Sequence, residues 1–414
     1  MSTPELSAGA IAPSVNRTGF YLAILQLVFT LGWTTYVIYL PKLAAQLGIA
    51  PSAVILILMM DQGIFTITDT AMGIAADRIA TVVGRLGMFV GALTALSCAA
   101  FFALPFVAGT GPAAQPWFIG LIVIWAITSS ALRAPPLTLL GKHRARPQIP
   151  FLAALAMLGY GLAGAVSPYL GVVLVKHDAR LPFVISSVVL LLTTLALSRV
   201  ERDLAEGGAS AGRPAEPAKP LGKVPTIFIV SMVVLALGYQ LHFSINSAPF
   251  YLRFAKPDDL QWLMPVFWIG FNIAMFPASV VTRRRGGLIV MGAAGLLGAV
   301  AVLGAELAGN LNTEIVAQFV AGAAWGCMLM SAISAALAIG ETGAEGKVIG
   351  LVFSALALAT FARMAAVAGG LQKLPEYAPL LHWAPVACWS VAGAGLLVIA
   401  ASRVQQRLAK ARTT

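Results

Sequence analysis

Apolar runs of about 20 residues, separated by short polar breaks, recur along almost the whole chain. A run of this length is what an α-helix needs to cross the hydrocarbon core of a bilayer. We predict that every run is helical, because an open strand cannot satisfy its backbone hydrogen bonds in lipid. The twelve predicted spans are residues 19–40, 52–76, 86–109, 116–140, 149–175, 181–198, 225–250, 261–282, 287–307, 313–339, 348–370 and 379–402.

The longest break, residues 199–224, divides six spans from six, and its mixture of charged residues with Gly, Ala and Pro is typical of a flexible linker. Similar short segments occur in both halves at nearly the same offset, such as residues 31–36 with 237–242 and Gly91-Ala92 with Gly292-Ala293. We therefore predict an all-α membrane protein made of two pseudo-symmetric six-helix bundles. The predicted divisions are an N-terminal tail (1–18), a first bundle (19–198), the linker (199–224), a second bundle (225–402) and a basic tail (403–414).

Composition and charge support a membrane protein and suggest its orientation. Hydrophobic residues make up 59% of the chain and charged residues only 10%, which lies outside the range of soluble proteins. The net charge of +11 comes from Lys and Arg in the breaks rather than from a continuous patch, so we expect no nucleic-acid partner. These basic residues concentrate on one side of the membrane, in the N-terminal segment and in every second break after it, as at Arg283-Arg284-Arg285. The positive-inside rule then places both termini in the cytoplasm of a multi-pass protein of the cytoplasmic (inner) membrane.

Features of an enzyme are missing from the sequence. Cys98, Cys327 and Cys388 each lie inside an apolar run, where we interpret them as packing residues. No cluster of His, Asp or Glu has the spacing of a metal or nucleophile site, and no phosphate-binding G-x-x-x-x-G-K-[ST] loop is present. We expect no enzymatic activity, no metal and no cofactor.

The second span ends in the segment DTAMGIAADR (69–78), and GR follows at 84–85. This pattern resembles the signature loop of the major facilitator superfamily, and the long interval before GR is similar to its glycoside-pentoside-hexuronide branch. The resemblance implies a fold of two six-helix bundles and a breakable latch on the cytoplasmic face, formed when a small glycine lets two helices approach and charged residues bridge them. The residues of this expected latch are Gly73, Asp77, Arg78, Gly84 and Arg85.

Two further features bear on coupling. Phe65 stands where sodium-coupled sugar carriers of that branch have a second acid, so the resemblance does not extend to a sodium site. The fifth span carries several glycines and Ser167-Pro168, a loose likeness of the Gly-Pro motif of superfamily antiporters. Close helix packing is the alternative explanation of those glycines.

Ionisable residues inside spans cost about 2.5–3.5 kcal/mol each on insertion scales, so each is a functional candidate. The resemblance implies that the second helix lies beside the fourth and the eleventh, so we pair Asp69 with Arg133 and Asp61 with Arg363. Static ion pairs without a role in coupling are the alternative. We interpret Asp61 as the carrier of the coupling proton, released when Arg363 is near, and His242 as a second candidate carrier that could instead be a packing residue.

The resemblance also implies a substrate cavity lined by the first, fourth, seventh and tenth helices. The polar and aromatic residues expected there are Gln26, Thr30, Trp33, Thr34, Tyr36, Tyr239, Gln240, Asn246 and Trp325. We predict a monomeric secondary transporter of a small organic solute, with protons and the lipid bilayer as its other partners. The alternatives are a proton-antiport exporter of amphipathic compounds, with a wide apolar cavity, and a transport-dead sensor or assembly factor, with its cavity filled.

Overall fold

A computed structural model describes residues 12–80, 82, 84–141, 148–206, 222–340 and 343–413. Within these residues every regular element is helical, and twelve helical stretches are long and apolar enough to cross a membrane. The predicted fold class and number of spans are therefore confirmed. Most of the expected N-terminal tail and most of the expected linker lie outside the described residues.

The first six spans contain both unbroken and segmented helices. Their elements are α1 (Ala12–Gln46), α2 (Pro51–Ile79), α3 (Arg85–Ala108), η1 (Pro112–Ala114), α4 (Gln115–Ser129), η2 (Ser130–Leu132), η3 (Pro135–Leu137), α5 (Thr138–Gly141), α6 (Ile149–Leu174), α7 (Arg180–Leu195) and α8 (Leu197–Glu206). The fourth span runs from η1 through α5, and the sixth combines α7 with part of α8.

The last six spans follow after residue 222. Their elements are α9 (Lys223–Leu241), the π-helix η5 (His242–Asn246), α10 (Ser247–Tyr251), η6 (Pro257–Asp259), α11 (Leu260–Leu263), α12 (Pro265–Arg285), α13 (Gly287–Glu306), α14 (Leu311–Ile339), α15 (Glu345–Ala368), η7 (Leu371–Lys373), η8 (Pro375–Tyr377) and α16 (Ala378–Thr413). Residues 403–413, which we expected to form a tail, continue helix α16.

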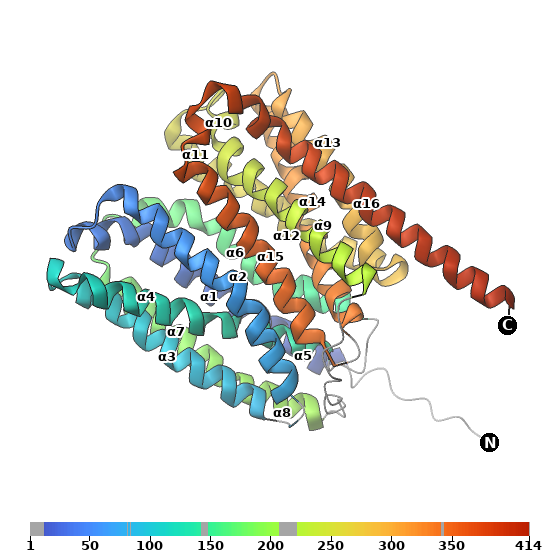
Figure 1. Cartoon of the computed structure of the whole chain (residues 1–414), viewed down its shortest axis with the longest axis horizontal. Helices are drawn as coiled ribbons and strands as arrows, with labels where there is room; N and C mark the ends of the chain where they lie inside the picture. Colours follow the sequence, from blue (N-terminus) through green and yellow to red (C-terminus); the bar gives the residue numbers. More distant parts are fainter. Residues whose placement is uncertain are drawn as a thin grey trace.

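The two halves meet along two pairs of helices. In Figure 1 the first half, coloured blue to green, lies beside the second half, coloured yellow to red, and α2 runs along α15. The other large contact between the halves joins α6 to α12, and α14 also packs against α6. The second span thus pairs with the eleventh and the fifth with the eighth, which is the same contact made twice when two six-helix repeats are related by a two-fold axis. A central site between the halves is therefore bordered by α2, α15 and α6.

The break in the fourth span follows from Pro135 and Pro136. Proline lacks the backbone N–H of a helical hydrogen bond and disfavours helical geometry in the preceding residue. The α-helix accordingly ends at Ser129 and gives way to 3₁₀ turns on both sides of Arg133. Thr138 donates a hydrogen bond to the carbonyl oxygen of Pro135 at 2.7 Å, which satisfies one backbone group that the break leaves free.

Candidate functional site

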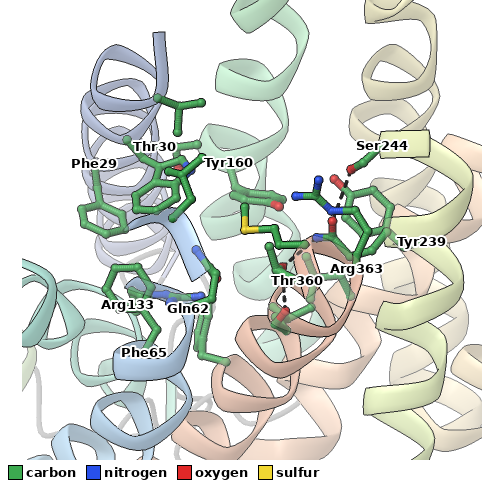
Figure 2. Close-up of a pocket in the computed structure, with 18 of the residues that line it drawn as sticks. Phe29, Thr30, Gln62, Phe65, Arg133, Tyr160, Tyr239, Ser244, Thr360 and Arg363 are labelled. Carbon is green, nitrogen blue, oxygen red and sulfur yellow. Dashed lines mark hydrogen bonds between the residues drawn. The ribbon is translucent and has the colours of Figure 1, made fainter. Parts of the chain in front are cut away.

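A cavity of about 320 Å³ lies between the two halves. Its wall combines hydrogen-bonding side chains with aromatic ones, the composition expected of a small-molecule site. The polar lining residues are Gln26, Thr30, Gln62, Arg133, Tyr160, Tyr239, Gln240, Ser244, Thr360 and Arg363, and the aromatic apolar ones are Phe29, Trp33, Phe65 and Phe353. Figure 2 shows Arg133 beside Phe65 and Gln62 on one wall, and Arg363 on the opposite wall with Tyr239 and Ser244.

Five of the residues expected in the cavity do line it: Gln26, Thr30, Trp33, Tyr239 and Gln240. Trp33 is held in place by stacking on Trp125 at a centroid distance of 5.6 Å, and the Gln26 amide donates a long hydrogen bond of 3.4 Å to the carbonyl of Leu132. These contacts fix the side chains before any ligand arrives.

The other four expected cavity residues bond elsewhere, so their assignment to the cavity was wrong in this conformation. Thr34 pairs with Ser167 across to α6 at 2.8 Å, and Asn246 donates to the carbonyl of Leu381 at 3.0 Å. Helical periodicity turns both side chains toward neighbouring helices. Tyr36 bonds to Asp61, and Trp325 is fully buried behind Tyr239.

Asp69 and Arg133 form the ion pair that we expected. Nη1 of Arg133 lies 2.9 Å from Oδ2 of Asp69, and the Asp69 side chain is fully buried while that of Arg133 is 15% exposed. The Arg133 guanidinium also lies over the rings of Phe65, at 4.8 Å, and Phe353, at 5.2 Å. Phe353 belongs to the other half, so the floor of the cavity is a neutralised charge pair held between aromatic rings of both bundles.

The second expected pair, Asp61 with Arg363, is not formed in this conformation. Asp61 is fully buried and accepts a hydrogen bond of 2.8 Å from the hydroxyl of Tyr36, while its Oδ1 has no partner. Tyr36 packs against Trp125, so this carboxyl lies inside the first bundle rather than at the interface. Depth along a helix does not define the direction in which a side chain points. Because the pair was expected only in the conformation where Arg363 is near Asp61, it stays a prediction.

Arg363 instead projects into the cavity from α15. Tyr239 lies close enough to interact electrostatically with both Arg363 and Tyr160. Figure 2 shows the Arg363 guanidinium between these tyrosines and Ser244. Its Nε is buried without a hydrogen-bond partner, and the described residues form no ion pair with it. A cation is therefore held inside the membrane without a protein counter-ion, which marks it as a functional candidate.

His242 lies in a buried polar chain away from the cavity. Its Nε2 is 3.1 Å from Oε1 of Gln318, whose amide nitrogen donates to Glu314 at 2.8 Å. Glu314 in turn lies 3.5 Å from Nη2 of Arg253. The π-helical turn that begins at His242 is a feature often found at functional sites.

The expected latch joins α2 to the start of α15. The Asp77 carboxylate accepts hydrogen bonds from the backbone N–H groups of Gly346, at 2.6 Å, and Lys347, at 2.8 Å. These N–H groups lie in the first turn of α15, where the helix dipole favours an anion. A Cβ added to Gly73 would clash with the carbonyl oxygen of Gly346, so the two helices touch backbone to backbone. Gly84 has a φ of 85° and begins the turn into α3, whose first residue, Arg85, is exposed, as is Arg78.

Several cavity residues were missed at the sequence level. Gln62, Tyr160 and Thr360 come from the second, fifth and eleventh spans, which the resemblance did not assign to the cavity. Each is a polar residue within an apolar run, and that signal could have identified them. The cavity draws on the interface helices as well as on α1, α9 and α14.

Comparisons with known proteins agree with this fold. A family model described as Major Facilitator Superfamily matches residues 22–359, and no curated protein matches significantly. Among solved structures, the chain is similar to the human organic anion transporter MFSD10 (16% identity, TM-score 0.64, covering 93% of this chain and 98% of that one). It is also similar to the E. coli fucose:proton symporter FucP in the outward conformation (13% identity, TM-score 0.66, covering 93% of this chain and 99% of that one). A third similar structure is that of the proton:xylose symporter XylE bound to 6-bromo-6-deoxy-D-glucose (14% identity, TM-score 0.63, covering 94% of this chain and 95% of that one).

Proposed function

The chain belongs to the Major Facilitator Superfamily, and on that premise we propose that it moves a small organic solute across the cytoplasmic membrane by proton-coupled alternating access. The observation that supports this most is the cavity between the halves, which is closed by the contact of Gly73 and Asp77 with α15 toward one end of α2. A cavity of about 320 Å³ weighs against a transport-dead relative, whose centre should be filled. The structural neighbours carry an organic anion or a sugar, so they do not define the substrate.

The aromatic lining from Phe29, Trp33, Phe65 and Phe353 favours one second candidate, an exporter of amphipathic compounds by proton antiport. The direction of proton movement separates the two. When substrate is added to de-energised cells, a symporter takes protons in with it and the medium becomes more alkaline. An antiporter releases protons as the substrate enters, and the medium becomes more acidic.

We propose that Asp61 carries the coupling proton, because a buried carboxyl without a counter-ion can bind and release one. Asp61→Asn should abolish accumulation driven by a pH gradient and retain substrate exchange, since exchange requires no net proton movement. The measurement is uptake and counterflow in reconstituted vesicles. Asp258→Asn, at an exposed acid in η6, is the matched control and should behave as wild type. Wild-type accumulation by Asp61→Asn would make Asp61 a structural residue.

We further propose that both termini, the linker and the Gly73–Asp77 end of α2 are cytoplasmic, from the distribution of Lys and Arg. Single cysteines at Ser210 and Thr110 test this orientation with an impermeant thiol reagent on intact cells. Thr110, at the loop after α3, should be labelled and Ser210 only after permeabilisation. The reverse pattern would invert the topology.

A further inference from the structure

The charges that line the cavity do not balance. Of its described lining residues, only Arg133 and Arg363 are charged, and no carboxylate is among them. Asp69, from behind the wall, neutralises Arg133 at 2.9 Å. None of the residues that the structure describes gives Arg363 such a partner, so the cavity carries about one uncompensated positive charge. A ligand with one negative charge would neutralise this positive charge.

The side chains around Arg363 leave the guanidinium free for a ligand. The Gln240 amide nitrogen donates to the hydroxyl of Thr360 at 2.8 Å, and Ser244 donates to the Gln240 carbonyl oxygen at 3.2 Å. These three polar groups therefore satisfy one another. Arginine presents several N–H donors in a planar fork that matches the two oxygens of a carboxylate, and Arg363 makes no hydrogen bond in the described chain that would occupy them.

Two tyrosines beside Arg363 are held rigidly. The Tyr239 ring stacks on Trp325 at a centroid distance of 4.5 Å and an interplanar angle of 3°, and Trp325 is fully buried. Tyr160 packs edge-on against Trp268 at 5.4 Å. The Tyr239 hydroxyl lies within hydrogen-bonding reach of Tyr160 and donates to it, which leaves the Tyr160 hydroxyl to donate to an anionic oxygen without further ordering of the side chain.

The wall opposite Arg363 is suited to an apolar group. Phe29, Trp33 and Phe65 line it, and Trp33 and Phe65 pack against each other at 5.6 Å. A ligand that spans the cavity would place one end at Arg363 and the other among these rings (Figure 2). The cavity therefore has one end with an unpaired cation and one end with aromatic rings, where the cation Arg133 is already paired with Asp69.

We propose that the transported solute is an organic monoanion with an apolar or aromatic body, and that Arg363 binds its carboxylate. This inference rests on the proposed transport function and adds the substrate class. A neutral solute would leave Arg363 unpaired inside the membrane, and a cation would be repelled. A second negative charge would find no free cation, because Arg133 is already paired with Asp69.

The test uses probes that share a hydrocarbon body and differ in charge. Benzoate, phenylacetate and 4-phenylbutyrate are titrated into the purified full chain at pH 7 by calorimetry, each against its neutral amide and its amine. At least one carboxylate should bind roughly 30-fold or more tightly than its amide, the factor expected when a buried charge loses its partner. The amines should not bind. If no carboxylate binds better than its amide, the substrate class is wrong.

Variants of Arg363 test the residue itself. Arg363→Gln should weaken carboxylate binding by a similar factor and remove the preference over the amide. Arg363→Lys keeps the charge and loses the two-pronged geometry, so its affinity for the carboxylate should lie between those of wild type and Arg363→Gln. Arg180→Gln is the matched control, because Arg180 is exposed at the start of α7 and outside the cavity. The role of Arg363 would be overturned if Arg363→Gln still preferred the carboxylate over the amide while eluting from a gel-filtration column as wild type does.

Failure of this inference is distinguishable from failure of the transport function. Spin labels at Val82 and Ala338, exposed residues in different halves, report whether the halves change their separation. A protein that alternates between two distances but prefers the amides would retain its transport function and lose the anion assignment. A protein that binds benzoate tightly yet stays at one distance and passes no solute would be an anion receptor, and the transport function would be wrong.

Discussion

Replacing Gly73 by alanine is expected to shift the protein roughly tenfold or more away from the conformation described here. A Cβ at this position would clash with the carbonyl oxygen of Gly346 in α15, and neither backbone can move without separating the helices. Overpacking of this kind costs about 1–3 kcal/mol, and each 1.4 kcal/mol changes an equilibrium tenfold. Since the proposed alternating access opens this contact in the other half of the cycle, we expect the strain to change the population of states rather than unfold the protein.

The distance between spin labels at Val82 and Ala338 measures this shift, and the longer distance should dominate in Gly73→Ala. Gly91→Ala is the control, since a Cβ at Gly91 in α3 meets nothing within 4 Å. Asp77→Asn should act in the same direction, because it removes the negative charge that the N-terminus of α15 binds, and it should reduce transport while leaving folding nearly intact. An unchanged distance distribution in both variants would contradict the latch.

The fold was predictable because hydrophobicity alone determines spans in a bilayer. Twelve apolar runs became twelve helical spans, because a helix satisfies the backbone hydrogen bonds of such a run in lipid. The arrangement in two bundles followed from the repeated segments and the family resemblance. The break at Pro135-Pro136 was not predicted: the fourth span was expected to be continuous over 116–140, and the structure shows 3₁₀ turns around Arg133, which lines the cavity.

The sequence predicted how deep in the membrane the site residues lie, but not the direction in which their side chains point. Asp69 and Arg133 lie at similar depths and do pair. Asp61 lies on the same face of α2 as Asp69, eight residues earlier, and that face turns into the first bundle toward Tyr36. The next residue, Gln62, lines the cavity. A rotation of one residue around a helix thus separates a cavity residue from a buried one, and only packing against neighbouring helices determines that rotation.

The last prediction asks whether Asp69 and Arg133 serve transport or only insertion into the membrane. Asp69→Leu leaves Arg133 without its counter-ion beside two aromatic rings, and removing one partner of a buried pair costs about 3–5 kcal/mol. The single variant should therefore lose much of its thermal stability in detergent. Asp69→Leu combined with Arg133→Met replaces the pair by apolar groups of similar volume, and it should recover most of that stability.

Transport by the double variant then decides between the two roles. Arg133 lines the cavity and reaches Phe353 of the other half, so the guanidinium contacts both bundles where they must move. We expect the double variant to be stable, to bind benzoate through Arg363 and to lose counterflow by at least tenfold, because the charged floor of the cavity is gone. Arg253→Met combined with Glu314→Gln, which removes both charges of an ion pair outside the cavity, controls for the loss of an ion pair and should keep counterflow. A stable double variant with wild-type counterflow would show that Asp69 and Arg133 form a static pair whose only task is to neutralise each other in the membrane.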